Sequence, residues 1–432
     1  MSAAAKMSPD RERRPGLVAF LLIASVLCAA AARAGAPPDS TAYVPGSSIM
    51  ADSVAAMPVD TTEVARRDAV DLLRGWFHRP ISTEMEGTSF GIDWSLLPTI
   101  SYNPVYGFAF GVLLSGAGRL GPNTTRYSQL AVSANYSSEG QLQAQVRGDM
   151  YEAGGNYLAK IDLRYLDTER STWGLGTITP DQQEYPMEFA LWRAYATLYR
   201  RASGPVFVGV GYHYDEYQDI VDQRAAAGES TPFSEYSGGV PSLTRASGLS
   251  LNVLADTRDN LVNPTGGYYL SWSTRDYPEG LGSDKTWQEL LVEMRVYPHV
   301  PRRSDNVLAF WLYGWMTFGP APYLNLPADG WDTYGRGARG YLQGRIRGAN
   351  QIYFETEYRF GITRDGLLGG VAFFNATMTT DPDTQVFSGS DHAVGVGLRL
   401  KFNKHTNTNL AIDHGWGEEG SRGWFLGMAE VF

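Results

Sequence analysis

The sequence predicts an all-β protein, namely a sixteen-stranded antiparallel transmembrane β-barrel. Segments of about ten residues alternate apolar and polar side chains over most of the chain, as membrane-spanning strands do. Short and long connections alternate between these segments. The chain also begins with an export signal and ends on an aromatic residue, Phe432.

Residues 1–34 have the features of a secretory signal peptide. Arg11, Arg13 and Arg14 precede an apolar run at residues 17–32, and the small-x-small motif of residues 32–34 predicts cleavage just before Gly35. The alternative is a transmembrane helix, but the run is shorter than the roughly 20 residues that a span needs.

Residues 35–89 are rich in Ala, Pro, Ser, Thr and Asp, a composition typical of a periplasmic linker. Within it, Asp60 and Thr61 could cap a short helix that runs through Leu72 and Trp76. That helix would be a plug or a periplasmic anchor, or a marginal helix on a tether, and we favour the tether because short helices are weakly stable alone.

Residues 90–432 form the predicted barrel. In residues 141–150, for example, Leu142, Ala144 and Val146 alternate with Gln143 and Arg147. A soluble β-sandwich shows the same period of two. So many strands of about ten residues with so few continuous apolar runs instead favour lipid outside and a wet lumen inside.

The predicted strands cover residues 94–101, 106–118, 127–137, 140–153, 157–167, 188–200, 204–218, 246–257, 266–277, 285–298, 305–318, 349–362, 366–378, 391–403, 406–415 and 422–432. Links after even-numbered strands are mostly short, whereas three long links, at residues 168–188, 218–245 and 319–348, follow odd-numbered ones. Short periplasmic turns and long external loops are the topology of a bacterial barrel with both ends in the periplasm.

The first and last strands must pair to close the barrel. Pro98 in the first strand has no N–H to give to a ladder, and Gly423 and Gly427 weaken the interior of the last. We therefore predict that this seam is the least hydrogen-bonded junction. Phe432, on the same face of the last strand as Trp424, is predicted to be the signal that the barrel assembly machinery reads during biogenesis.

Charge and composition exclude several classes of function. The formal net charge is −10, and it becomes −13 without the five basic and two acidic residues of the signal peptide. A general nucleic-acid binder needs a basic face instead. The one cysteine, Cys28, lies in the signal peptide, so no disulfide or thiolate metal site is expected.

Enzymatic activity, cofactors and metals are not expected either. The chain has no Gly-x-Ser-x-Gly motif, and no histidines lie at metal-ligand spacing on a helix. Asp413 and His414 near Ser421 suggest a lipid hydrolase triad, but neighbours on a strand point to opposite faces, so Asp413 cannot easily orient His414.

The long link after the eleventh strand carries the most specific sequence, Arg339, Gly340 and Tyr341. Together with the run from Asp256 to Asn260, the Gly-Val-Gly-Leu-Arg strand at residues 395–399 and the terminal Phe432, it makes the chain from about residue 90 onward resemble the BamA/TamA family of outer-membrane assembly and secretion barrels, also called the bacterial surface antigen family.

The resemblance implies that the Arg-Gly-aromatic motif folds back into the lumen. A buried arginine needs a carboxylate or carbonyl partner, and Glu355 and Glu357 face the lumen on the next strand. The family supplies a further acid from a Phe-x-Asp-x-Gly pattern, where this chain has Asn375, which gives no charge. The alternative is that Arg339 is a solvated loop arginine.

The resemblance also implies a role in inserting or translocating polypeptide or lipid at the outer membrane of a Gram-negative bacterium. Family members carry periplasmic POTRA domains for handling substrates, whereas the roughly 55 residues after Gly35 are too few and too polar for such a core. We therefore expect a separate periplasmic POTRA-type partner and contact with outer-membrane lipid. The alternative is a structural or passive pore-forming barrel without transport activity.

Overall fold

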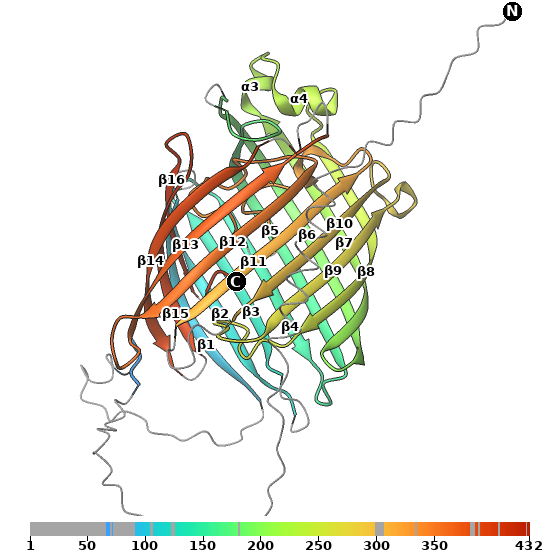
Figure 1. Ribbon diagram of the computed structural model, residues 1–432. Helices are drawn as coiled ribbons and strands as arrows, with labels where there is room; N and C mark the ends of the chain where they lie inside the picture. Colours follow the sequence, from blue (N-terminus) through green and yellow to red (C-terminus); the bar gives the residue numbers. More distant parts are fainter. Residues whose placement is uncertain are drawn as a thin grey trace, which may run out of the picture.

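Sixteen antiparallel strands, each paired with its neighbours in sequence, form one sheet that curves into a barrel (Figure 1). The computed structural model describes residues 66–69, 71, 91–103, 107–121, 126–179, 182–298, 306–332, 335–380, 385–387, 389–404, 407–428 and 430–432. The signal peptide at residues 1–34 and most of the linker, including Leu72 and Trp76, lie outside these ranges.

The strands are β1 (Gly91–Asn103), β2 (Gly107–Arg119), β3 (Ser128–Ser137), β4 (Leu142–Tyr151), β5 (Tyr157–Thr172), β6 (Tyr185–Ser203), β7 (Val206–Asp222), β8 (Leu243–Asp256), β9 (Tyr268–Tyr277), β10 (Trp287–Val296), β11 (Val307–Phe318), β12 (Asn350–Gly361), β13 (Leu368–Thr379), β14 (Asp391–Asn403), β15 (Thr408–Trp416) and β16 (Arg422–Met428). Each coincides with a predicted strand, so the predicted fold class is confirmed.

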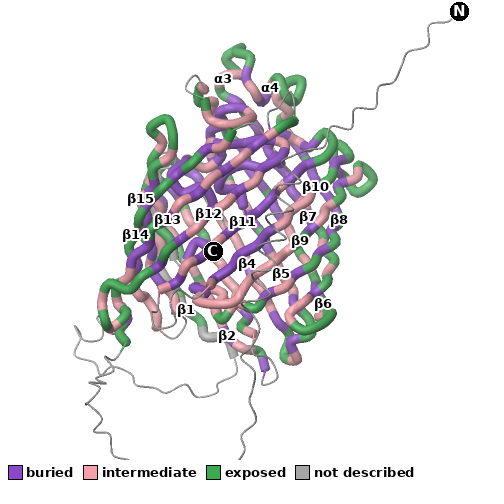
Figure 2. The backbone as a smooth tube through the Cα atoms, in the orientation of Figure 1, coloured by how far each residue is buried: buried purple, intermediate pink, exposed green. Residues whose placement is uncertain are grey.

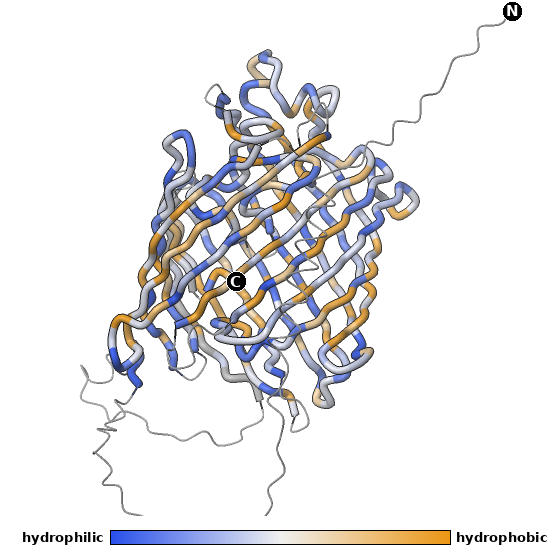
Figure 3. Tube along the Cα trace, in the orientation of Figure 1, coloured by the Kyte–Doolittle hydropathy of each residue, from blue (hydrophilic) through white to orange (hydrophobic). Residues whose placement is uncertain are grey.

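The barrel wall carries its charges inside and its apolar side chains outside. On β14, Val394, Val396 and Leu398 are 52%, 53% and 60% exposed, whereas Arg399 is 4% exposed. Charged side chains of other strands are buried in the same way on the inner face. Burial and hydropathy therefore alternate along the strands (Figures 2 and 3). A soluble protein has the opposite arrangement, so this wall suits a lipid surround.

Long connections gather at one end of the barrel, where the two short helices α3 (Gln223–Ala226) and α4 (Pro232–Ser237) lie (Figure 1). Phe233 of α4 stacks on Tyr323 of the 3-10 turn η2 (Tyr323–Asn325), with ring centroids 4.6 Å apart. This packing ties the β7–β8 connection to the one between β11 and β12. The 3-10 turn η1 (Glu279–Leu281) lies in the β9–β10 connection. None of the described helices is long and apolar enough to cross a membrane.

The seam between β1 and β16 differs from every other junction. Ladders join each strand to the next from β1 to β16, but no ladder joins β16 to β1 among the described residues. Pro98 pairs with Val112 of β2, and Gly423 and Gly427 pair with Gly415 and Ala411 of β15, so all three lie in the strands that flank this seam.

The prediction that Phe432 closes the last strand is wrong. β16 ends at Met428, and Phe432 is only 3% exposed. Figure 1 draws the C-terminal end within the outline of the barrel, away from both rims. The physical reason lies in Glu430, which has the same phase as the outward-facing Trp424 and Leu426. A continued strand would turn this carboxylate toward lipid, which is unfavourable.

A short piece of the linker contacts the turns at the opposite end of the barrel from α3 and α4. Lys404 donates from its backbone N–H to Asp68 at 3.0 Å and from Nζ to Asp71 at 2.8 Å. The Arg67 N–H donates to the carbonyl of Asp365, in the turn between β12 and β13, at 3.0 Å. Arg67, Asp68 and Asp71 thus connect two neighbouring turns.

Candidate functional site

The connection between β11 and β12, residues 319–349, folds into the barrel, and we call it the lumenal loop. Its apolar side chains bury against the inner wall: Leu324, Leu326 and Ala328 pack with residues of β6 and β7, and Ala338, Tyr341 and Ile346 pack with Trp311 and Tyr353. Burial of these side chains stabilises the inserted position of the loop by roughly 25 cal/mol for each Å² of apolar area removed from water.

Arg339 lies at the centre of this loop and is 1% exposed. Its Nη2 donates to both Glu355 and Glu357 of β12, and its Nη1 donates to Asp413 of β15 at 2.6 Å. The guanidinium carbon also lies 3.7 Å from the centre of the Phe373 ring. Arg339 is therefore held inside the lumen by three carboxylates and one aromatic face, rather than solvated among external loops.

Electrostatics accounts for the ionisation of this arginine. Burial alone would lower the pKa of Arg339, but the carboxylates around it outweigh burial and hold its pKa well above the ordinary value. Asp329, elsewhere in the lumenal loop, shows the opposite balance. Burial raises the pKa of its carboxyl well above the ordinary value, and the negative charge of Asp391 adds to this effect. In the lumenal loop, the surroundings therefore favour the charged form of Arg339 and disfavour the charged form of Asp329.

Gly340 and Tyr341 fit the loop against the wall. Gly340 has φ +114°, and a Cβ built on it would lie 2.7 Å from the Cβ of Ala393, so only glycine fits there without strain. The Tyr341 hydroxyl donates to the carbonyl of His392 at 2.5 Å and accepts from the Glu418 N–H at 3.1 Å. The motif thus contacts β14 and the β15–β16 connection together.

Asn375 stands where the family pattern has an acid, and Asp413 supplies the missing carboxylate from another strand. Asn375 Nδ2 donates to the backbone carbonyl of Arg339 at 2.9 Å, so it holds the loop but supplies no charge. The third carboxylate comes instead from Asp413, two strands away, which the sequence suggests only as a partner of His414. The sequence could have indicated Asp413 through the alternation of its strand. This alternation places Asp413 on the lumenal face and His414 on the outer face.

A continuous ion network extends from Arg339 toward the end of the chain. Arg359 Nε lies 2.8 Å from Glu357, and Arg399 lies 2.5 Å from Asp413 and 2.7 Å from Glu430. We call this set the lumenal ion network; its members are Arg339, Arg359, Arg399, Glu355, Glu357, Asp413 and Glu430. Its three cations and four carboxylates link the lumenal loop to β12, β14 and β15 and to the last residues.

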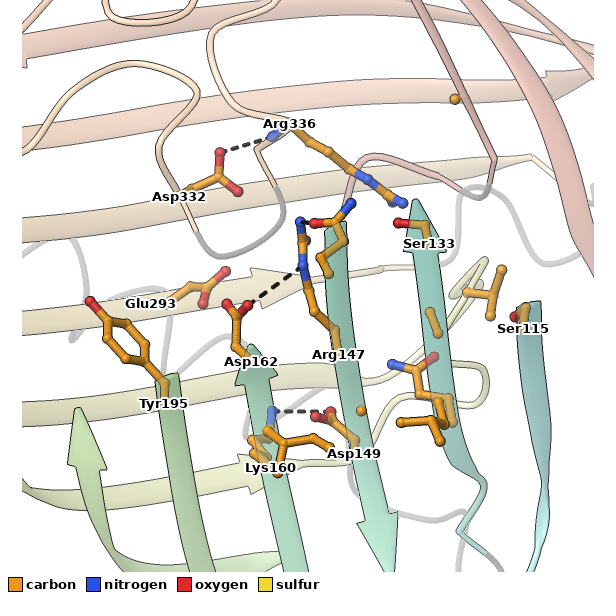
Figure 4. Close-up of a pocket in the computed structure, with 18 of the residues that line it drawn as sticks. Ser115, Ser133, Arg147, Asp149, Lys160, Asp162, Tyr195, Glu293, Asp332 and Arg336 are labelled. Atoms are coloured by element: carbon orange, nitrogen blue, oxygen red, sulfur yellow. Dashed lines mark hydrogen bonds and ion pairs between the residues drawn. The ribbon is translucent and has the colours of Figure 1, made fainter. Parts of the chain in front are cut away.

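The rest of the lumen contains a cavity of about 770 Å³. Its wall presents paired charges, including Lys160 with Asp149 at 3.1 Å and Arg147 with Asp162 at 3.8 Å (Figure 4). Arg336 and Asp332 of the lumenal loop face the same space (Figure 4). Most of the lining is apolar and these charges are paired, so the cavity does not suit a single strongly charged ligand.

The chemistry that this site can perform is electrostatic positioning of a loop. Within the described ranges, no group of three or more histidines and carboxylates is arranged to hold a metal ion. Asp413, which a hydrolase would need beside His414, is committed to Arg339 and Arg399.

Comparison with known proteins gives the following matches. The model of the Omp85 superfamily domain matches residues 124–406. The crystal structure of BamA from Haemophilus ducreyi lacking POTRA domains 1–3 is similar with a TM-score of 0.50 at 13% identity, over 78% of this chain and 69% of that one. CdiB from Escherichia coli is similar with a TM-score of 0.52 at 11% identity, over 78% of this chain and 62% of that one. The chain therefore spans less than two thirds of that CdiB chain. No curated protein matches the sequence.

Proposed function

Because this chain belongs to the Omp85 superfamily, we propose that it acts in the outer membrane of a Gram-negative bacterium, where it helps to insert or translocate polypeptide or lipid. The barrels of this superfamily that resemble it include BamA and CdiB. Their likeness supports the fold, and the activity proposed for this chain rests on features of its own barrel.

The observation that carries the proposal is the seam. Every other neighbouring pair of strands shares a ladder, whereas β1 and β16 share none among the described residues. Unpaired backbone N–H and C=O groups are costly in a bilayer, so such a seam has a low barrier to opening sideways and can pair with an incoming strand. A passive pore gains nothing from this arrangement.

The periplasmic side supports a separate partner. We base this on the composition of residues 35–89, which is typical of a linker rather than of a folded substrate-handling domain. Arg67, Asp68 and Asp71 are held against the turns that contain Asp365 and Lys404. We infer that a partner with POTRA-type domains approaches this end of the barrel, and co-purification after cross-linking in cells would identify it.

The decisive experiment locks the seam. In a Cys28→Ser background, Leu96→Cys in β1 and Leu426→Cys in β16 are joined by a bifunctional thiol reagent, because both side chains face outward. Reporter insertion is measured as the folding rate of a small β-barrel into vesicles that contain this protein. We expect locking to abolish the acceleration of reporter folding.

A matched control joins Ile412→Cys to Leu426→Cys, which are partners in the β15–β16 ladder, and so leaves the seam free. This control should keep the acceleration. If the locked seam also keeps it, lateral opening is not the mechanism.

The alternative is a passive pore, favoured by the cavity of about 770 Å³ in the lumen. The lumenal loop fills the barrel beside this cavity and opposes free flow. Planar-bilayer recordings distinguish the two functions, because a passive pore should show a stable open conductance without any substrate.

A further inference from the structure

The last three residues of the sequence, 430–432, lie inside the lumen like a bound peptide. Glu430, Val431 and Phe432 are 3%, 9% and 3% exposed. They follow β16 but take no part in its ladder, which ends with Met428 opposite Leu410. We call them the terminal segment.

The side chain of Glu430 is fully paired. Arg399 Nε donates to Oε2 at 2.7 Å and Asn409 Nδ2 donates to Oε1 at 2.6 Å. Arg359 Nε lies 3.9 Å from the same carboxylate. A buried carboxylate is tolerated only with such partners, so the wall of β12, β14 and β15 is built to receive an acidic side chain at this point.

The backbone of the terminal segment is held as well. The Glu430 N–H donates to the carbonyl of Val262 at 3.1 Å, and Arg336 donates to the carbonyl of Glu430. Arg359 Nη2 donates to the carbonyl of Phe432 at 2.8 Å. Three arginines therefore converge on three consecutive residues, two from the wall and one from the lumenal loop.

Phe432 fills an aromatic pocket. Its ring centroid lies 5.3 Å from that of Trp311 and 6.5 Å from that of Tyr297, and the Arg359 guanidinium carbon lies 5.5 Å from it. These distances are typical of aromatic pairs and cation–π contacts. Such contacts stabilise the bound ring by more than the burial of its apolar area alone. The pocket selects a large aromatic side chain two positions after the acidic one.

We propose that these surroundings form a peptide-binding site in the lumen, specific for a short segment with a carboxylate two residues before an aromatic side chain. Its residues are Arg336, Arg359, Arg399, Asn409, Tyr297 and Trp311. The occupant is the chain's own terminal segment, an intramolecular ligand whose docking ends β16 at Met428 and keeps the following residues away from β1.

Two shared residues couple this site to the lumenal loop. Asp413 binds both Arg339 and Arg399, and Glu357 binds both Arg339 and Arg359. The inference goes beyond the proposed function, because docking of the terminal segment can hold whether or not the barrel inserts or translocates anything. Its test therefore measures docking alone, without a transport assay.

The first test follows the accessibility of the terminal segment. Val431→Cys in the Cys28→Ser chain is labelled with a water-soluble maleimide in detergent micelles, with Ser237→Cys on exposed α4 as the reference for a free thiol. We expect Val431→Cys to react at least tenfold more slowly than the reference. Adding Arg399→Gln should raise its rate at least tenfold, because Glu430 loses its closest cation.

Two further variants serve as a control and as an independent test of this result. Arg164→Gln removes another buried lumenal arginine, one that pairs with Asp162 away from the terminal segment, and should leave the rate unchanged. Glu430→Gln should raise the rate as Arg399→Gln does, while leaving the wall arginines in place, and serves if Arg399→Gln fails the heat-modifiability check for folding. A Val431→Cys rate equal to the reference, or one unchanged by Glu430→Gln, would overturn the proposal.

The second test supplies the ligand in trans. A chain ending at Ala429 is mixed with a fluorescein-labelled peptide of residues 427–432, and binding is followed by anisotropy. We expect saturable binding to the shortened chain, at least tenfold weaker binding of a peptide with Gln in place of Glu430, and no binding to the full chain, whose site is filled. Equal binding to the full and shortened chains would contradict the proposal, as would no binding to a shortened chain that remains heat-modifiable.

Discussion

The two sides of the barrel lumen pair their charges in different ways. On the wall of β5 to β7, partners are close in sequence: Arg164 pairs with Asp162, two residues away, and Arg193 pairs with Asp215 of the next strand. The wall of β12 to β15 has such local pairs, for example Arg359 with Glu357, but it also has distant ones. Arg339 of the lumenal loop reaches Asp413, 74 residues away, and Arg359 reaches Phe432, 73 residues away. The charged side chains of the first wall find partners on the strands themselves. Those of the second wall also need partners from the lumenal loop and the terminal segment.

This difference indicates where the molecule can change state. Pairs within the sheet persist for as long as the strands persist, so the wall of β5 to β7 serves as a scaffold. Pairs that depend on inserted segments can separate without unfolding a strand, and they lie next to the one junction that lacks a ladder among the described strands. The following predictions compare the two walls, from the largest expected effect to the smallest.

Arg339→Ala should destabilise the barrel most, by about 3–5 kcal/mol, because it leaves buried Glu355 without a cation and takes one of the cations from Glu357 and from Asp413. Arg164→Ala, on the scaffold wall, should be less harmful because Arg147 also lies near Asp162. Urea unfolding in micelles, followed by heat-modifiability on gels, measures both. Equal losses would show that the inserted loop is no more critical than the wall.

Gly340→Ala should cost about 2–4 kcal/mol, since an alanine there combines an unfavourable positive φ with a Cβ pressed against Ala393. Gly204→Ala is the matched control, because Gly204 also has positive φ, +51°, but a methyl group added to it would meet nothing within 4 Å. The same unfolding assay should show a loss of about 1–2 kcal/mol for that control. A control as damaged as Gly340→Ala would remove the close approach to Ala393 as the cause.

Acidity should strengthen the docking of the lumenal loop through Asp329. Because its folded pKa is raised, its contribution to stability is fully present below the unfolded pKa of about 4 and is lost as pH rises through the folded pKa. Asp329→Asn, which stays neutral, should be more stable than the wild type at pH 8 by about 1–2 kcal/mol and should lose part of the pH dependence. Unfolding curves at pH 5 and pH 8 test this, and identical pH dependence in both proteins would contradict it.

Tyr341→Phe should have the smallest effect, about 0.5–1.5 kcal/mol, because it removes the hydroxyl that bridges His392 and Glu418 but keeps the buried ring. Proteolysis of the lumenal loop in the folded barrel should detect this loosening more readily than global unfolding does. If loop cleavage is unchanged, the hydroxyl contributes nothing to holding the loop.

Much of the fold was predictable because its physics is local. A period of two fixes which face of a strand meets lipid, and connection length fixes which ends lie together. That reasoning located all sixteen strands, and it also placed Glu355 and Glu357 on the lumenal face, where the structure brings them to Arg339. The two partners of Arg339 on β12 could be predicted because the alternation along that strand alone places them on the lumenal face.

The sequence by itself thus determined the sheet and its inside-out polarity. Tertiary structure alone decided that Asp413, and not residue 375, supplies the third carboxylate to Arg339, since this depends on where the loop enters the lumen. It also decided where Phe432 lies, because the phase of Glu430 disfavours a longer strand but does not say where the residues after Met428 go. The strand ends where it does because Glu430 finds its cations, Arg399 and Arg359, on other strands inside the barrel.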